Sequence, residues 1–188
     1  RTARHHTYPP HPDVSSVELL ETRIVPSAPH PVDLSSLNGS NGFRIDGIDA
    51  NDNSGRSVSN AGDVNGDGFD DVLIGAYRGD AAGNSKSDAG ESYVVFGQSS
   101  GFAASLDLST LNGTNGFRID GASGASSSGR SVSAAGDVNG DGFADLAIGA
   151  PGEGYLFNTL RGQAQINGAG VVHIAHGSPG GLVTQNIL

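Results

Sequence analysis

Residues 61–76 read AGDVNGDGFDDVLIGA, and residues 135–150 read AGDVNGDGFADLAIGA, so one acidic, glycine-rich run occurs twice, 74 residues apart. Each run ends in a short apolar segment. Asp-Gly and Asn-Gly steps followed by alternating apolar residues indicate a tight loop that leads into a β-strand. The carboxylates crowded into each loop repel one another, and what neutralises them is the first question about function.

The repeat extends well beyond these two runs. Residues 33–48 return at 107–122 and residues 54–63 at 128–137 with the same offset of 74, whereas residues 90–97 match 170–177 with an offset of 80. The second copy therefore carries about six additional residues, which we expect to lengthen a loop near 154–170. We divide the chain into an N-terminal arm (1–32, an extended linker or docking segment) and two copies, 33–106 and 107–188.

Each copy contains four short apolar or alternating segments separated by turn residues, which predicts strands at 42–46, 56–61, 71–76, 92–97, 116–120, 130–135, 145–150 and 171–177. We expect an all-β fold of antiparallel sheets, in which each copy forms a four-stranded blade of the β-propeller type. Because a propeller needs about 4–8 blades, two blades leave exposed strand edges. The chain is expected to self-associate in a ring or a filament, or to pack on neighbouring blades of a longer protein.

Composition excludes several classes of partner. The net charge of −10 makes DNA or RNA an unfavourable partner. The longest apolar runs are far shorter than the roughly 20 residues that span a bilayer. The chain has no cysteine, so it has no disulfide framework.

The acidic loops favour calcium. Oxygen-bearing side chains fall at loop positions 1, 3, 5 and 9, glycine at position 6 permits a sharp turn, and position 7 offers a backbone carbonyl, which gives about six hard oxygen ligands. Position 12 is Ile74 in one loop and Ile148 in the other, where an EF-hand has a bidentate carboxylate. We predict two Ca²⁺ ions per chain, held by Asp63, Asn65, Asp67, the Phe69 carbonyl and Asp71, and by Asp137, Asn139, Asp141, the Phe143 carbonyl and Asp145.

Two further expectations concern this loop. The ring of Phe69 is expected to point into the core, and Asp70 to face solvent, because Ala144 replaces it in the second copy. The alternative to a calcium site is a solvated Asp/Asn-Gly turn that holds no metal.

The combination of YVVFG (93–97), DVNGDGFDD (63–71) and AIGAP (147–151) resembles the FG-GAP repeat of integrin α-subunit propellers and their bacterial relatives. Phe96-Gly97 and Gly149-Ala150-Pro151 match the two sequence signatures, whereas Tyr77 replaces the proline in the first copy and His176 the phenylalanine in the second. The resemblance covers residues 33–182. It implies a β-propeller with calcium in hairpin loops, used in adhesion or extracellular recognition, and a secreted or cell-surface location.

The leading hypothesis is a calcium-stabilised, non-catalytic extracellular repeat protein for adhesion, matrix or structural assembly, which binds an extracellular protein or glycan. The alternatives are a purely structural ring or filament subunit, and a propeller-type enzyme that acts on glycans. The enzyme is disfavoured because the glutamates stand only at 18, 21, 91 and 153, with no nucleophile and base clustered beside them in sequence.

Several smaller motifs have structural interpretations. Arg78-Gly79-Asp80 spells a tripeptide that integrins bind, but chance explains three residues easily. The glycosylation patterns at Asn38 and Asn112 also suit Asn-Gly turns. His173 and His176 are expected on opposite faces of one strand. Arg44 with Asp46, and Arg118 with Asp120, are expected to form structural pairs or to contact the neighbouring blade rather than to act in catalysis.

Overall fold

The computed structural model describes residues 33–159, 162–166 and 168–182, and within them the chain is all-β. The only helical segments in these ranges are the 3₁₀ turns η1 (Leu34–Ser36), η2 (Ala82–Asn84) and η3 (Leu108–Thr110). The chain divides into two units, residues 1–36 and 37–188. The predicted arm, 1–32, lies outside the described residues. No helix in the described part of the chain is long and apolar enough to cross a membrane.

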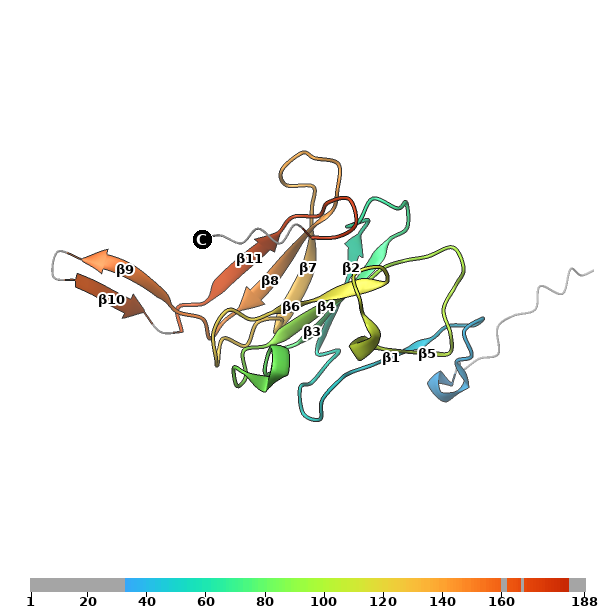
Figure 1. The fold of residues 1–188 in the computed structure, drawn as a ribbon, viewed down its shortest axis with the longest axis horizontal. Helices are drawn as coiled ribbons and strands as arrows, with labels where there is room; N and C mark the ends of the chain where they lie inside the picture. Colours follow the sequence, from blue (N-terminus) through green and yellow to red (C-terminus); the bar gives the residue numbers. More distant parts are fainter. Residues whose placement is uncertain (1–32, 160–161, 167, 183–188) are drawn as a thin grey trace, which may run out of the picture. The chain divides into compact units, whose positions relative to one another are not determined.

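The first sheet has four strands, β2 (Ser57–Gly62), β3 (Asp71–Ala76), β4 (Glu91–Val95) and β6 (Gly116–Asp120). They lie in the order β2-β3-β4-β6, and every neighbouring pair is antiparallel (Figure 1). The second sheet has three strands, β7 (Ser131–Gly136), β8 (Asp145–Ala150) and β11 (Val171–Ala175), with β8 in the centre. All eight predicted strands are confirmed to within about two residues at each end.

The grouping of the strands differs from the expectation that each sequence copy forms its own blade. Strand β6 opens the second copy, but it pairs with β4 and completes the sheet of the first copy. Its equivalent in the first copy is β1 (Arg44–Asp46), which forms a parallel three-residue ladder with β5 (Ser105–Asp107) instead. The sheets are therefore staggered by one strand against the sequence repeat, a fact that no local pattern in the sequence contains.

The inserted residues of the second copy also differ from expectation. They form an antiparallel hairpin of β9 (Tyr155–Thr159) and β10 (Gly162–Ile166), which pair only with each other among the described strands, where a plain loop was predicted. Polar and apolar residues alternate along β10, as is typical of a strand.

One apolar cluster joins the two sheets and fixes their relation. It contains Ala61, Val64, Leu73, Val94 and Phe96 of the first sheet and Leu146 of the second, all buried. A second cluster lies on the other face of the first sheet, where Ile74, Tyr93 and Val95 pack on Leu108 and on residues of the β1–β5 ladder. The first sheet is thus covered by the second sheet on one face and only in part on the other, where Val58 remains 60% exposed.

Candidate metal loops

Both aspartate loops connect the first two strands of a sheet, the first loop (63–71) between β2 and β3 and the second loop (137–145) between β7 and β8. They lie at the same end of the two sheets, at the top of Figure 1. A β-bulge at Gly62 and another at Gly136, with φ of 71° and 75°, turn the chain out of the ladder at the start of each loop. A positive φ is adopted by glycine without steric cost, which explains the glycine at both positions.

The first loop is organised by its own aspartates. Asp63 Oδ1 accepts hydrogen bonds from the amides of Gly66 (2.7 Å) and Asp67 (3.1 Å), and its Oδ2 accepts one from Gly68 (2.9 Å). The Asp67 carboxylate accepts from the amide of Phe69 at 2.9 Å and from the Asn65 side-chain amide at 2.9 Å. Asn65 Oδ1 accepts from the amide of Asp67.

The second loop repeats this network almost bond for bond. Asp137 accepts from the amides of Gly140 (2.7 Å), Asp141 (3.1 Å) and Gly142 (2.9 Å). Asp141 accepts from the amide of Phe143 (3.0 Å) and from the side chain of Asn139 (2.8 Å). Because two separate stretches of chain fold identically, the loop conformation follows from the local Asp-x-Asn-Gly-Asp-Gly sequence itself.

The last aspartate of each loop is buried at the start of a central strand. Asp71 accepts from the amides of Val64 (3.0 Å) and Gly97 (2.9 Å), and Asp145 accepts from Val138 (2.8 Å) and Gly177 (3.0 Å). Each carboxylate thereby ties its loop to the residue two positions after the third strand, which is the glycine of Phe-Gly in the first copy. The sequence analysis did not predict that the amides of Gly97 and Gly177 bind these aspartates. The recurrence of a glycine at this place after the strand in both copies could have indicated it.

The two buried carboxylates titrate differently. Burial raises the pKa of Asp71 to about 6, the two amide bonds oppose this shift, and the negative charges of Asp67 and Asp63 add to it. Burial also acts on Asp145, but the amides of Val138 and Gly177 and the side chain of His176 together outweigh it and lower the pKa. His176 Nδ1 lies 3.3 Å from Asp145 Oδ1, in the place that Phe96 has in the first copy.

The donor chemistry of the loops suits a hard cation such as Ca²⁺. All side-chain ligands proposed for the first loop are carboxylate or amide oxygens. Burial raises the pKa of Asp71, and the negative charges of Asp67 and Asp63 add a smaller contribution in the same direction. These oxygens now accept amide hydrogens, and no group of three or more His, Asp or Glu side chains converges as a ready metal cage in the described residues. Calcium therefore stays a prediction.

The expectation that the Phe69 ring enters the core is wrong, because the residue is 42% exposed. Its counterpart Phe143 is partly buried, since a side chain at Gly66 of the first loop would collide with the Phe143 ring. Phe143 thus packs on the first loop, which belongs to the neighbouring sheet. Asp70 is exposed as expected, and it accepts a hydrogen bond from Asn60 at 3.3 Å.

The second sheet clamps the first loop through three backbone hydrogen bonds. Ala144, Ser178 and Gly180 donate to the carbonyls of Asp63 (3.0 Å), Val64 (3.0 Å) and Asn65 (3.3 Å), respectively. Val64 is fully buried beneath this contact, whereas its counterpart Val138 is 56% exposed. The first loop is therefore packed in the interface between the two sheets, whereas Val138 of the second loop faces away from that interface.

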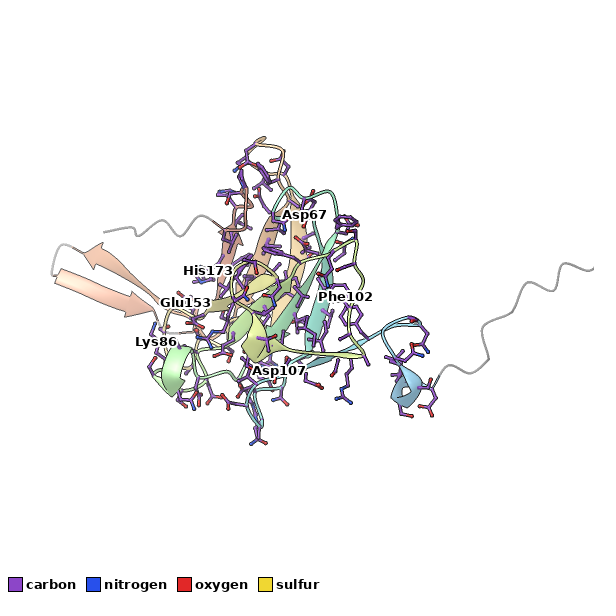
Figure 2. All side chains as sticks on the ribbon, turned by 45° about the vertical axis from the view of Figure 1, so that its right-hand side comes forward. Asp67, Lys86, Phe102, Asp107, Glu153 and His173 are labelled. Atoms are coloured by element: carbon purple, nitrogen blue, oxygen red, sulfur yellow. The ribbon has the colours of Figure 1, made fainter. Side chains whose placement is uncertain are left out.

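The remaining motifs have structural partners. Arg44 pairs with Asp46 and Arg118 with Asp120, each at 2.7 Å, as predicted. His173 bonds Glu153 at 2.7 Å and His176 approaches Asp145, so the two histidines take separate partners, as Figure 2 shows for His173 and Glu153.

The turn motifs are likewise accounted for by local structure. Asn38 and Asn112 cap tight turns by accepting the amides of Ser40 and Thr114, both at 2.9 Å. Gly79 is buried between Arg78 and Asp80, so the tripeptide is not presented as an exposed tip.

The model of the FG-GAP repeat matches residues 54–95 and 128–174. The chain carries two FG-GAP repeats. The matched ranges span β2 to β4 and β7 to β11, so they begin after the strand that is staggered into the preceding sheet.

Two relatives are integrin chains of Drosophila melanogaster. Integrin alpha-PS2 is 35% identical over 119 residues, which is 62% of this chain and 8% of that protein. Integrin alpha-PS5 is 36% identical over 102 residues, 52% of this chain and 9% of that protein. The chain thus corresponds to less than a tenth of each integrin.

Proposed function

We propose that this chain is a calcium-stabilised, non-catalytic repeat module of a secreted or cell-surface protein, which works in adhesion, matrix or structural assembly. The FG-GAP repeats and the likeness to integrin alpha chains support an extracellular adhesion-type role. The partner is a neighbouring blade, a second copy of the chain, or an extracellular protein or glycan.

The observation that carries the proposal is the duplicated loop with a buried acid. Asp71 and Asp145 are 1% and 0% exposed, and Asp71 is held beside two further carboxylates. A buried carboxylate among like charges is costly unless it takes up a proton or a cation. Calcium would be held by Asp63, Asn65, Asp67, Asp71 and the Phe69 carbonyl, and by their counterparts. Its positive charge would offset the burial and the weaker repulsion that together raise the pKa of Asp71.

The residues of the chain prepare such a site without the ion. The amide bonds to Asp63 and Asp67 fix the turn. Asp63 Oδ1 accepts two amide hydrogens, whereas Asp63 Oδ2 and Asp67 Oδ1 each accept one and so retain a lone pair for an ion. The ion would bind the folded loop only, so it stabilises the fold by mass action.

Calorimetric titration of the chelated chain tests this role. We expect about two sites per chain, and Asp67→Ala combined with Asp141→Ala should abolish both. Asp70→Ala is the matched control, because Asp70 is an exposed loop aspartate with no counterpart in the second loop. Unchanged calcium binding in the double variant contradicts the assignment.

The melting temperature supplies an independent readout. A chelator should lower it, and calcium should restore it better than magnesium, because magnesium demands a tighter octahedral shell and dehydrates reluctantly. Equal rescue by both ions argues against the loop as a calcium site.

A further inference from the structure

The first sheet contains a slot that the second copy fills. The turn at residues 126–129 lies across the ends of β2, β3 and β4, where the Ser57 hydroxyl donates to the Gly129 carbonyl at 2.7 Å and Ser128 donates its amide to Ala89 at 3.0 Å. Gly75 and Gly90 line the slot, and a Cβ at either position would collide with the backbone of Gly129 or Ser128. The glycines of the first sheet are therefore required by this close approach.

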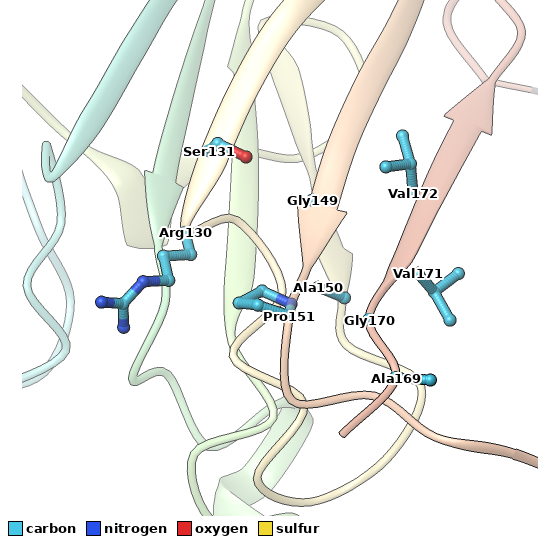
Figure 3. A pocket seen from close by; sticks show the side chains of 9 residues that line it. All are labelled: Arg130, Ser131, Gly149, Ala150, Pro151, Ala169, Gly170, Val171 and Val172. Carbon is cyan, nitrogen blue, oxygen red and sulfur yellow. The ribbon is translucent and has the colours of Figure 1, made fainter. Parts of the chain in front are cut away.

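The same slot exists in the second sheet and nothing in the described residues fills it. A pocket of about 580 Å³ is lined there by Ser131, Gly149, Ala169, Gly170 and Val172, the counterparts of Ser57, Gly75, Ala89, Gly90 and Ser92 (Figure 3). A Cβ at Gly149 would meet only the neighbouring Ser131 side chain. The filled slot of the first sheet shows what kind of segment this pocket accepts.

The face around the pocket is apolar and exposed. Val138, Val172 and Ile174 are 56%, 65% and 46% exposed. Their counterparts Val64, Ser92 and Val94 are each 0% exposed, because the second sheet covers them. The outward face of the second sheet thus has the chemistry of a surface that is buried in the first.

One edge of β11 pairs with no strand among the described residues, and the first copy contains a strand that matches it. Strand β6 pairs with β4 in the register Ser92↔Ile119 and Tyr93↔Arg118. Residues 42–46, which end in β1, have the same sequence as β6, Gly-Phe-Arg-Ile-Asp. Transferred to β11, the equivalent β1 register places Ile45 opposite Val172 and Arg44 opposite His173.

The charges at this edge also correspond. In the first sheet, Tyr93 bonds the buried Glu91, and Arg118 of the paired strand lies 3.7 Å from that carboxylate. In the second sheet His173 replaces Tyr93 and bonds Glu153, so a carboxylate again stands where the arginine of a paired strand would arrive. Arg44 would find there the partner that Arg118 finds in Glu91.

The complementary face is exposed on the first copy. Gly55 is exposed, and Val58 and Phe69 are 60% and 42% exposed. Their counterparts Gly129, Val132 and Phe143 are buried or partly buried against the first sheet. The first copy therefore exposes the residues that would enter such a contact, and the second copy contains the pocket that would receive them.

We infer that the outward face of the second sheet binds the first copy of another chain of this protein, with the turn at 52–55 in the pocket and β1 added to the edge of β11. The contact repeats the interface inside the chain. One bond is not reproduced, because Ser126, whose hydroxyl donates to Ala89, is Asp52 in the first copy. β1 must leave its three-residue parallel ladder with β5, and gains a longer antiparallel one.

The contact is head-to-tail, so it generates a ring if it closes and a filament if it does not. The inference rests on the proposed self-association and is independent of the calcium sites.

Disulfide cross-linking of the full chain tests the register, and the absence of cysteine from the sequence removes background. Chains with Ile45→Cys are mixed with chains carrying Val172→Cys and oxidised. Directly opposed residues of an antiparallel pair are close enough for a disulfide. We expect at least about tenfold more cross-linked heterodimer than in the control mixture of Ile45→Cys and Val171→Cys, since adjacent residues of a strand point to opposite faces.

Light scattering supplies the second measurement. Val172→Lys should lower the associated fraction at least about tenfold without lowering the melting temperature, because Val172 is exposed in the single chain, whereas Ser85→Lys on the exposed turn after η2 should leave it unchanged. Association without the cross-link preference overturns this interface while leaving self-association standing. A chain that is monomeric at all concentrations overturns both, and calcium titration decides the proposed metal role separately.

Discussion

The first and second aspartate loops have nearly the same sequence and the same internal hydrogen bonds, yet the residues packed around them differ. The first is clamped by Ala144, Ser178 and Gly180 of the second sheet, and its Val64 is buried. The second has no such clamp among the described residues, and its Val138 is exposed. Local sequence determines the shape of the loop, and the neighbouring sheet determines what each residue in it contributes to stability.

The largest expected difference concerns Gly75 and Gly149. Gly75→Ala places a methyl group against the Gly129 carbonyl and should lower the free energy of unfolding by about 3 kcal/mol. Gly149→Ala meets only the rotatable Ser131 hydroxyl and should cost less than about 1 kcal/mol. Urea unfolding at low protein concentration, which keeps copies apart, measures both. Equal losses would mean that the second sheet does not press on the first.

The second pair is Val64 and Val138. Val64→Ala removes two methyl groups from a fully buried site and should cost about 2 kcal/mol, whereas Val138→Ala should stay within about 0.5 kcal/mol. The same urea series reads both values. A loss at Val138 as large as that at Val64 would show that its exposed position is covered in solution.

These pairs also show what the sequence reveals and what it does not. Short alternating segments between Asn-Gly and Asp-Gly turns predict the eight strands, because side-chain alternation and turn chemistry are local properties. The pairing of β6 with β4 is non-local. Residues 42–46 have the same sequence as β6, Gly-Phe-Arg-Ile-Asp, but β1 within them pairs with β5. The prediction that the Phe69 ring is buried was wrong for the same reason, because burial at this position depends on a neighbouring sheet.

The candidate site divides in the same way. The spacing of Asp63, Asn65 and Asp67 predicts a compact oxygen-rich turn, and the structure has one. The burial of Asp71 beneath Gly97, and the approach of His176 to Asp145, depend on residues 26 and 31 positions further along the chain, so spacing alone gives no sign of them.

The third prediction uses the pH dependence of stability in a chelator. The pKa of Asp71 is raised from 3.8 to about 6, so the folded chain holds this proton more tightly than the unfolded chain. Its contribution to the free energy of unfolding is therefore largest below pH 3.8, declines as the pH rises to about 6, and is constant above. We expect a decline of at least about 1 kcal/mol, since burial is relieved in part by local relaxation.

Asp71→Asn should flatten this dependence. Asp145→Asn should not, because the pKa of Asp145 is lowered, and the stability from that group is lost only as the pH falls through the lowered value. A profile that Asp71→Asn leaves unchanged would contradict the difference between the two loops.

The smallest effect is expected from His176→Phe, which gives the second loop the residue that the first has at Phe96. Loss of the imidazole 3.3 Å from Asp145 should raise the pKa of that carboxyl towards that of Asp71, with a change in stability below about 0.5 kcal/mol. Carboxyl-carbon NMR follows the titration directly, and His173→Phe, within β11 and three residues before His176, is the control. An unshifted Asp145 would mean that His176 has no part in the contrast.

The staggered strand β6 has a consequence for how such repeats are counted. In a linear array of such repeats, the last strand of each sheet comes from the following sequence copy. The last sheet of the array therefore lacks one strand, and the first strand of the first copy has no preceding sheet to join. Two copies accordingly give one four-stranded and one three-stranded sheet here, and β1 pairs with β5 outside both. In a closed ring, the first strand of the first copy can complete the sheet of the last copy, so every copy then has one complete sheet.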